Sequence, residues 1–522
     1  MKILVADALD PSGLELLAQA GAGIRQVAPN ERDRLPELIA DADALVVRSA
    51  TKVTAELMRA GRKLKVVGRA GIGVDNVDVA AATDLGILVV NAPTANLTSA
   101  TEHSLALLLG LARQIPAADA SMKRGEWDRK SFLGVELHGK TLGVVGFGRI
   151  GQRVAERAKA FEMKVLAYDP FLDPAAARRL DVEIVPLDDL LREADAVTLH
   201  TPFTEQTKNL ISRERIAAMK RGALLVNCAR GGLIDEDALL EALDSGQIGG
   251  AAIDVFVEEP PADWRLAKHP RVVATPHIGA QTREAQERIS AETAQMLLAA
   301  LEGSMPAAAV NLPFRPTGAR GEPYLKLGER LGRLASLLLE APPQRLDVEL
   351  WNLDEPLRHP VAVAALKGAL FPALREAVNY VNAERLAESR GLEVVRSTHS
   401  APSDDPHRVS VRLAGGGKTV EIDGALFGES EVRVVRFGGY RLEFRPEGHL
   451  LVVENRDVPG VVGQLGTLLG QGGVNIADIH LARRASGEAL AVLRLDQTPP
   501  AELLEKLRGL PEVLRASCID LT

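Results

Sequence analysis

Residues 140–170 decide the fold of this chain and read KTLGVVGFGRIGQRVAERAKAFEMKVLAYDP. They open with an apolar, valine-rich run that predicts a buried parallel strand. The motif G-x-G-x-x-G follows at Gly146, Gly148 and Gly151, and an amphipathic helix comes next. A second strand then ends at Asp169. This order of strand, glycine turn, helix, strand and acid predicts a βαβ unit that binds a dinucleotide.

Each residue of the motif has a distinct physical role in that prediction. Gly146 permits the tight turn, Gly148 lets the backbone approach a pyrophosphate, and Gly151 lets the helix pack closely on the sheet. The helix N-terminus offers free N–H groups to the phosphates. Asp169 can accept hydrogen bonds from both ribose hydroxyls, and its charge would repel a 2′-phosphate. The expected cofactor is therefore NAD rather than NADP.

Composition narrows the class of protein. The chain has 522 residues, which suggests about three to four domains. The net charge of −8 and the lack of a basic stripe argue against nucleic acid as a partner. The apolar runs are too short to span a bilayer, and the N-terminus does not resemble a signal peptide. Two cysteines, Cys228 and Cys518, form no metal-binding pattern and suit a reducing cytoplasm.

A second α/β unit precedes the nucleotide unit. Polar residues follow its predicted strands, and Arg48 and Arg69 are the charged ones. Ligands gather at the carboxyl ends of strands in open α/β sheets, and two arginines there suit an anionic substrate. The predicted strands are 3–6, 44–48, 65–67 and 87–90. The residues predicted to contact the substrate here are Arg48, Arg69, Gly71, Ile72, Gly73 and Asn96.

The nucleotide unit continues after Asp169 with further strands, which end at polar residues predicted to face one cleft. A long helix over 99–126 is expected to lead into this unit, and His103 within it is interpreted as a packing residue. A helix over 281–302 is expected to return to the first unit, which makes that unit discontinuous. The four strand-end residues are Thr201, Arg230, Asp254 and His277.

Three residues carry the expected chemistry. Oxidation of a secondary alcohol needs a base for the hydroxyl proton, an anchor for the substrate and a hydride acceptor. The imidazole of His277 suits the base, and Glu259 would fix its tautomer. Arg230 offers a bidentate fork to a 2-hydroxy carboxylate. We therefore predict Arg230, Glu259 and His277 as the catalytic residues.

The C-terminal third shows two further units without a catalytic constellation. Over residues 320–447 the pattern predicts a helix at 324–339, a strand at 347–351, a helix at 372–389 and hairpins from 409 to 444. Residues 449–522 predict the order βαββαβ, which is ferredoxin-like.

The motifs VVRSATKV, VGRAGIGVDNVD, NCARGGLIDEDAL, DVFVEEP and TPHIGAQT, together with the glycine turn, resemble the D-isomer-specific 2-hydroxyacid dehydrogenases. Arg48, Arg69 and the C-terminal extension narrow the resemblance to the long-form branch that oxidises 3-phospho-D-glycerate in L-serine biosynthesis. The resemblance implies a Rossmann doubly wound nucleotide domain inserted in a flavodoxin-like substrate domain, then an α+β intervening domain and an ACT domain. The implied boundaries are 1–98 with 284–312, 99–283, 313–447 and 449–522.

The resemblance also implies roles for particular residues. The ACT domain is a regulatory module that binds amino acids at paired interfaces, and Asn455 and Asn475 match the ligand positions of its serine-sensing version. Val453 stands where some of those versions have a histidine. The family implies a homo-oligomer, a dimer or tetramer, paired through the region around 121–137, and no metal. The implied cofactor contacts are Gly146, Gly148, Arg149, Ile150, Gly151, Asp169, Thr201, Cys228, Ala229, Asp254, Gly279 and Ala280.

Two alternatives stay open at this point. The substrate could be another 2-hydroxy acid, such as 2-hydroxyglutarate, glycerate or glyoxylate. The fold also serves non-catalytic corepressors that sense NADH.

Overall fold

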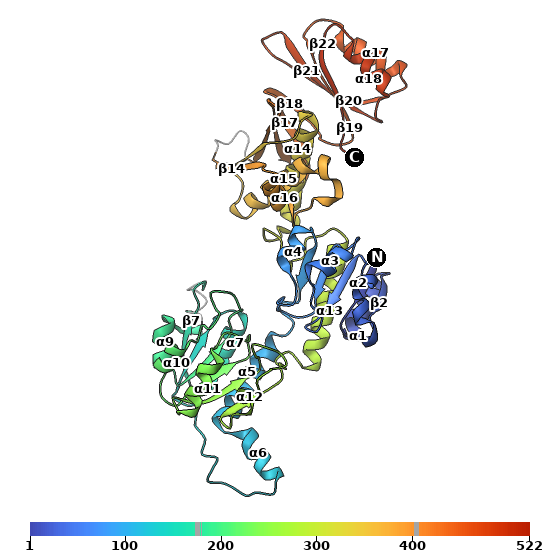
Figure 1. The fold of residues 1–522 in the computed structure, drawn as a ribbon. Helices are drawn as coiled ribbons and strands as arrows, with labels where there is room; N and C mark the ends of the chain where they lie inside the picture. The colour runs from blue at the N-terminus through green and yellow to red at the C-terminus, as the bar shows by residue number, and fades with distance from the viewer. Residues whose placement is uncertain (173–177, 179, 401–406) are drawn as a thin grey trace.

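The computed structural model describes residues 1–172, 178, 180–400 and 407–522. Four β-sheets follow one another along an elongated molecule (Figure 1). The nucleotide unit lies at one end, the unit that begins at the N-terminus is next to it, and the last C-terminal unit lies at the other end (Figure 1). Among the described helices, none is long and apolar enough to cross a membrane.

The first sheet has five parallel strands in the order β2-β1-β3-β4-β5, the predicted flavodoxin-like order. Its central strand β3 has the sequence ALVV and is completely buried, because helices cover both faces. Helix α13 returns from the nucleotide unit and packs on α1, where Gly13 N donates to Ser290 Oγ at 3.1 Å. The elements are β1 (Lys2–Val5), α1 (Pro11–Gln19), β2 (Gly23–Gln26), η1 (Pro29–Arg34), α2 (Leu35–Leu38), β3 (Ala44–Val47), α3 (Ala55–Ala60), β4 (Val66–Arg69), α4 (Val79–Asp84), β5 (Leu88–Asn91) and α13 (Arg283–Leu301).

The second sheet has seven parallel strands in the order β12-β11-β10-β9-β6-β7-β8. The order reverses between β6 and β9, which is the Rossmann switch point where a crevice opens at the carboxyl ends. The predicted doubly wound fold is thus confirmed. The elements are α5 (Leu97–Ala112), α6 (Ile115–Lys123), β6 (Thr141–Val145), α7 (Arg149–Ala160), β7 (Lys164–Tyr168), β8 (Glu183–Ile184), α9 (Leu187–Glu193), β9 (Ala196–Leu199), α10 (Arg213–Ala218), β10 (Ala223–Asn227), α11 (Glu236–Asp244), β11 (Ile248–Ile253), α12 (Arg265–Lys268) and β12 (Val272–Ala274).

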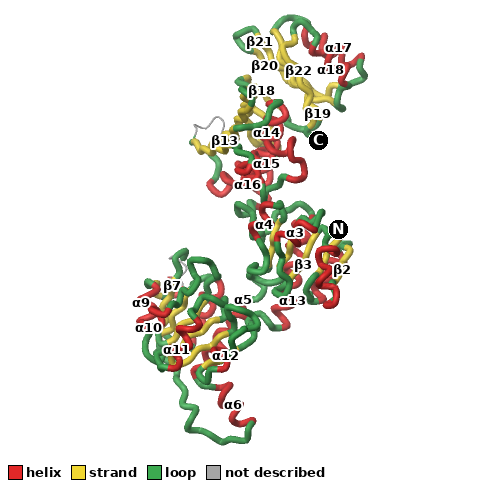
Figure 2. The backbone as a smooth tube through the Cα atoms, in the orientation of Figure 1, coloured by secondary structure: helices red, strands yellow, loops and turns green. Residues whose placement is uncertain are grey.

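The long helix expected over 99–126 is wrong, because it is two helices. Gln114 adopts a left-handed backbone with φ of 53°, and Pro116 lies in the first turn of the new helix α6. Proline fits that position because its missing N–H would have no partner in the first turn. Helix α6 and the long loop after it extend away from the sheet (Figure 2).

The third unit places helices on one face of a six-stranded mixed sheet with the order β14-β13-β15-β16-β17-β18. Helices α14 and α15 cross closely, since a Cβ on Gly332 would lie 2.0 Å from the carbonyl oxygen of Ala365. The helix expected over 372–389 is wrong, because α15 ends at Leu374. The elements are α14 (Gly318–Leu339), β13 (Arg345–Trp351), α15 (Glu355–Leu374), η2 (Arg375–Ala377), α16 (Ala383–Ser389), β14 (Glu393–His399), β15 (Arg408–Gly415), β16 (Lys418–Phe427), β17 (Glu431–Phe437) and β18 (Tyr440–Phe444).

The fourth unit has the predicted order βαββαβ and an antiparallel sheet with the order β20-β21-β19-β22. One sheet face, with Leu451 and Val453, packs on the unit's own helices. The other face, with Leu450 and Val452, packs on the third unit. The elements are β19 (His449–Arg456), α17 (Val461–Gln471), β20 (Ile476–Arg483), β21 (Glu488–Leu495), α18 (Ala501–Arg508) and β22 (Val513–Asp520).

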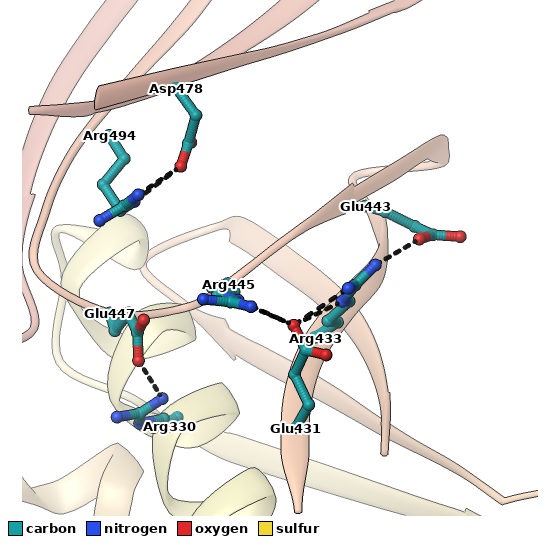
Figure 3. Close-up of polar contacts among 8 residues, drawn as sticks. All are labelled: Arg330, Glu431, Arg433, Glu443, Arg445, Glu447, Asp478 and Arg494. Carbon is teal, nitrogen blue, oxygen red and sulfur yellow. Dashed lines mark hydrogen bonds and ion pairs between the residues drawn. The ribbon is translucent and has the colours of Figure 1, made fainter. Parts of the chain in front are cut away.

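Charged side chains surround the contact between the third and fourth units (Figure 3). Arg330 on α14 pairs with Glu447 at 3.1 Å, just before β19 begins. On the fourth unit, Arg494 Nε donates to Asp478 at 2.8 Å. The guanidinium of Arg484 lies over the ring of Tyr440, 4.0 Å from its centroid. The cation–π contact therefore joins the apolar contact in holding the two units together.

Candidate active site

The three glycines of the turn meet the demands predicted for them. Gly146 has φ of 92°, and a Cβ there would lie 2.7 Å from the carbonyl group of His200. A Cβ on Gly151 would lie 2.1 Å from the carbonyl oxygen of Gly146, so only glycine lets α7 approach the turn. Among the described residues, nothing lies within 4 Å of a Cβ built on Gly148. The turn is therefore tight underneath and open above, as a bound pyrophosphate requires.

Asp169 lies beside this turn at the end of β7. Its Oδ2 accepts a hydrogen bond from the N–H of Phe147 at 2.9 Å, and its Oδ1 accepts one from Phe171 at 2.9 Å. Each carboxylate oxygen can accept a further hydrogen bond. Asp169 thus holds the glycine turn and keeps capacity for the ribose hydroxyls. Arg149 and Ile150 are the first two residues of α7. The Nη1 atom of Arg149 donates to the carbonyl of Pro93 at 3.4 Å.

The remaining predicted cofactor residues lie beyond the ends of β9, β10, β11 and β12. Thr201 has a buried hydroxyl without a hydrogen-bond partner within the described part of the chain. Burial raises the pKa of Cys228 to about 12, so this residue stays a neutral thiol. Ala229 follows it, and its N–H donates to the side chain of Asn227 at 3.0 Å. An unpartnered hydroxyl and a neutral thiol are suitable for the wall of a cofactor crevice.

Asp254 is buried, with 1% of its surface exposed, and organises the turn after β12. It accepts hydrogen bonds from the Thr275 hydroxyl at 2.6 Å and from the N–H groups of Ile278 and Gly279 at 2.9 Å each. Burial alone would raise the pKa of Asp254, but hydrogen bonds from His103, Thr275 and Ile278 hold that pKa below its usual value. The carboxylate therefore carries a stable negative charge under the turn that ends at Ala280.

The predicted base and its partner are in contact. Nδ1 of His277 lies 2.7 Å from Oε2 of Glu259, and the other carboxylate oxygen accepts from the N–H of Phe256 at 3.2 Å. The side chains of His277 and Glu259 are 42% and 39% exposed, so both face solvent in the cleft. Since the carboxylate of Glu259 accepts the hydrogen bond from Nδ1 of His277, the Nε2 atom of the same ring is available as a proton acceptor. This arrangement suits a general base.

Three arginines approach one another across the cleft. Arg230 donates from Nε to Asp75 at 3.0 Å, and a Cβ on Gly73 would lie 1.9 Å from its Nη2. Burial, followed by the positive charge of Arg230, lowers the pKa of Arg69 to about 10, and Arg48 adds to that effect. The Nε of Arg69 is buried without a partner among the described residues. The cluster therefore holds more positive charge than its neighbours neutralise.

The loop after β4, the end of β5 and the residue before α5 complete this side of the site. Gly71 has φ of 145°, and a Cβ there would lie 1.7 Å from Nη1 of Arg69. The carbonyl of Ile72 accepts from Asn91 at 2.6 Å. The side-chain oxygen of Asn96 is buried and has no partner in the described ranges. The structure thus places Arg69 beside Gly71 and Arg230 beside Gly73.

Sequence reasoning missed several residues that support this site. Asp7 is buried and accepts from the N–H of Arg48 at 2.7 Å, which fixes the strand end. Asn76 donates to the carbonyl of Arg48 at 2.6 Å. His103, interpreted as a packing residue, reaches Asp254 at 3.2 Å. Single polar residues inside strands, loops and helices carry no spacing signal, so only the three-dimensional structure identifies them.

The two predicted effector residues lie at opposite ends of the last sheet. Asn455, 4% exposed, is opposite Ala489 at one end of β21, whereas Asn475 precedes β20, whose first residue pairs with Leu495 at the other end. The side-chain oxygen of Asn455 is buried without a partner in the described part of the chain. One chain alone therefore does not bring the two asparagines together.

Comparison with known proteins agrees with this architecture. Residues 105–279 match the NAD-binding domain of D-isomer specific 2-hydroxyacid dehydrogenases, residues 321–438 match the D-3-phosphoglycerate dehydrogenase intervening domain, and residues 449–512 match the ACT domain.

Relatives that match this chain over its whole length include two D-3-phosphoglycerate dehydrogenases. The D-3-phosphoglycerate dehydrogenase of Methanocaldococcus jannaschii is 42% identical over 100% of both chains. That of Bacillus subtilis is 39% identical over 100% of this chain and 99% of its own. A D-lactate dehydrogenase of Aquifex aeolicus, solved with NAD and lactic acid, is 31% identical with a TM-score of 0.52, covering 58% of this chain and 96% of that one. The chain belongs to the D-3-phosphoglycerate dehydrogenase family, an NAD-dependent branch of the D-isomer specific 2-hydroxyacid dehydrogenases.

Proposed function

We propose that this chain oxidises 3-phospho-D-glycerate to 3-phosphooxypyruvate with NAD, the first step of the phosphorylated route to L-serine. Three features, which lie beyond the carboxyl ends of strands in the two parallel sheets, carry the proposal. They are the glycine turn with Asp169, the His277–Glu259 pair at 2.7 Å, and the cluster of Arg48, Arg69 and Arg230.

The residues of the crevice fit NAD. The open space above Gly148 and the N-terminus of α7 suit a pyrophosphate, and Asp169 suits an unphosphorylated ribose. We assign the unpartnered hydroxyl of Thr201 and the turn at Gly279 and Ala280 to the same crevice. When bound there, NAD supplies the acceptor for the hydride that leaves the substrate carbon.

The base step follows from the geometry of His277. Nε2 takes the proton from the substrate hydroxyl oxygen while the hydrogen on the same carbon leaves with its electron pair, so a C=O bond forms. The imidazolium that results faces the carboxylate of Glu259, which stabilises its positive charge. The alcohol thus loses one proton to the protein and one hydride to the cofactor, which balances the oxidation.

The arginine cluster supports a doubly anionic substrate. We assign Arg230 to the carboxylate, because it reaches Gly73 of the substrate unit from the nucleotide unit and its guanidinium offers two parallel donors. We assign Arg48 and Arg69 to the phosphate, since they lie at the carboxyl ends of the adjacent strands β3 and β4. Arg69 is buried among like charges, so an entering dianion relieves their repulsion.

The test is a panel of 2-hydroxy acids with NAD, followed by NADH absorbance. Phosphoglycerate should give the highest kcat/KM, and Arg69→Ala should lower that value much more for phosphoglycerate than for unphosphorylated glycerate. Preference for 2-hydroxyglutarate, glycerate or glyoxylate would contradict the substrate assignment. NADH binding without turnover of any substrate would favour the corepressor alternative.

We also propose that the chain forms a homo-oligomer through α6 and the loop that follows it. This arm exposes large apolar side chains, with Ile115 55%, Trp127 78% and Leu133 86% exposed. Exposed apolar residues on one extended segment are typical of a surface that a partner covers. We also propose four domains, with the boundaries 1–98 with 284–312, 99–283, 313–447 and 449–522. We propose a cytoplasmic location as well, because the two cysteines are free thiols, which a reducing compartment preserves.

Regulation by L-serine at the ACT domain is a further part of this proposal. The buried, unpartnered oxygen of Asn455 can accept from the ammonium of an amino acid. Asn455 and Asn475 lie at opposite ends of β21, so two copies placed side by side in opposite directions would bring Asn455 of one next to Asn475 of the other. A ligand held across that seam would favour the paired arrangement.

A further inference from the structure

His103 contacts the turn that carries the base, although it is no part of the catalytic set. It lies in the middle of α5, and 16% of its side chain is exposed. Its Nε2 atom is 3.2 Å from Oδ1 of Asp254 and 3.2 Å from the hydroxyl oxygen of Thr275. Since a carboxylate can only accept, Nε2 carries the proton in this contact and donates it.

The acceptor of this hydrogen bond holds the base turn at several points. Asp254 receives the N–H groups of Ile278 and Gly279 on its carboxylate, and its main-chain carbonyl receives the N–H of His277 at 2.8 Å. His277 itself has φ of 52°, a left-handed conformation that a non-glycine residue rarely adopts. Such a conformation persists only where surrounding contacts impose it, and Asp254 makes those contacts.

The same face of α5 also contacts the return of the chain to the first unit. Ser99, one helical turn before His103, has its hydroxyl 2.8 Å from that of Thr282. Thr282 caps α13 by accepting from the N–H of Ala285 at 3.1 Å. The two chain crossings between the substrate and nucleotide units are thereby joined beside His103. Helix α5 therefore links the hinge region and the base turn through two side chains.

We propose that His103 is a positioning residue for the catalytic base. By donating Nε2–H to the buried Asp254, it fixes the orientation of that carboxylate. The carboxylate in turn holds the Ile278 and Gly279 amides, and so aims the imidazole of His277 at the substrate hydroxyl. This inference rests on the proposed function of His277 and goes beyond it, because His103 touches neither substrate nor cofactor in that scheme.

The kinetic test compares three substitutions in the full-length protein. His103→Leu removes the donor, His103→Asn shortens it, and His103→Gln keeps an N–H donor at nearly the same reach. We expect kcat with phosphoglycerate to fall about 10- to 100-fold in His103→Leu and His103→Asn, since a misplacement of about 1 Å can cost that much. His103→Gln should recover most of the loss. KM for phosphoglycerate should stay within about twofold, since the arginine cluster is untouched.

A matched control is His138→Leu, which removes another histidine–carboxylate pair, on the exposed surface of the same unit. It should leave kcat unchanged. Equal kcat in wild type and His103→Leu would overturn the proposal, and so would a loss in His103→Gln as large as in His103→Leu. If His103→Leu does not fold, His103→Asn takes its place and the comparison with His103→Gln decides.

Hydrogen exchange gives a readout that does not depend on turnover. The amides of Ile278 and Gly279 should exchange faster in His103→Leu than in wild type, and His103→Gln should restore their protection. Unchanged protection in His103→Leu would overturn the proposal. If wild type does not oxidise phosphoglycerate, the proposed function fails, and the exchange rates still decide whether His103 holds the turn.

Discussion

Nε of Arg230 lies 3.0 Å from Oδ2 of Asp75, so an arginine of the nucleotide unit is held by an acid of the substrate unit. The side chains are 28% and 58% exposed, and therefore water screens the pair. Asp75 also counters the repulsion that Arg69 experiences from its neighbours. The acid thus acts as a local counter-charge for the cluster until an anionic substrate enters.

The Asp75→Asn variant should make stability depend on anions. Without the acid, the three guanidinium groups repel one another with less compensation, so Tm should fall slightly. Added sulfate should raise Tm more in the variant than in wild type, because the anion replaces the lost charge. Thermal unfolding with sulfate, and with chloride at equal ionic strength as the control, measures this. An equal sulfate effect in both proteins would show that Asp75 does not balance the cluster.

The His277→Ala variant should lose turnover while it still binds the cofactor. We expect kcat to fall about 100-fold or more, since a positioned general base contributes that much. Glu259→Gln should cause a smaller loss, because an amide can keep a contact with Nδ1 but cannot stabilise the imidazolium by charge. NADH fluorescence should show unchanged binding in both variants. Near-normal kcat in His277→Ala would mean that another group takes the proton.

The succession of strands and helices along the two catalytic units was predictable, because most of their strands are short apolar runs that end at glycine or polar residues. The edge strands β2 and β8 were missed, since they are exposed and have no apolar pattern. Helix α15 was missed for the opposite reason. Residues 361–366 are all buried, so the segment lacks the polar face that gives a helix its period.

The chemistry of the site was predictable where a motif fixed it, and less so where single residues act. Arg230, Glu259 and His277 matched motifs, and the structure pairs His277 with Glu259 and Arg230 with Asp75, while their catalytic role stays a prediction. His103 stands among leucines of α5, so its pattern is that of a core residue. Its role depends on a contact with Asp254 across 151 positions of sequence, which no local signal contains.

Asp169 should govern the choice of cofactor by its charge. Asp169→Asn keeps an acceptor for the N–H of Phe147 but removes the repulsion toward a 2′-phosphate, so efficiency with NADP relative to NAD should rise. Asp169→Ala should also loosen the glycine turn and weaken both cofactors. Steady-state kinetics with each cofactor separates these effects. Equal efficiency with NAD and NADP in wild type would contradict the assignment.

The pKa of Arg69 predicts how substrate binding responds to alkaline pH. Burial and the charge of Arg230 lower this pKa to about 10. Arg69 is therefore charged below about pH 10 and becomes neutral above it, so KM for phosphoglycerate should rise as pH passes that value. In Arg69→Ala, KM should be high at neutral pH and should lack this rise. KM measured from neutral pH to about pH 11 tests this, and a wild-type KM that stays flat would show that Arg69 does not bind the substrate.

L-Serine should inhibit the enzyme by binding at the paired ACT domains. Asn455 is buried with a free oxygen, and Gly460 lies just before α17, whose N-terminal N–H groups suit the carboxylate of an amino acid. Because the third unit covers the sheet face with Leu450 and Val452, pairing must use the remaining edges or helices. Asn455→Ala and Asn475→Ala should each relieve inhibition and leave basal kcat unchanged.

The measurement is activity of the full-length protein against L-serine up to millimolar levels, with calorimetry on the same protein and D-serine as the control. Val453 is buried in the domain core, so this residue offers no polar group to the ligand. Binding must then depend on the two asparagines and the helix N-terminus, and loss of either asparagine should remove most of the heat. If wild type shows neither inhibition nor heat with L-serine, the domain does not bind this ligand and serves assembly alone. Heat without inhibition would mean that L-serine binds without preferring one domain arrangement, because such a ligand cannot alter a distant site.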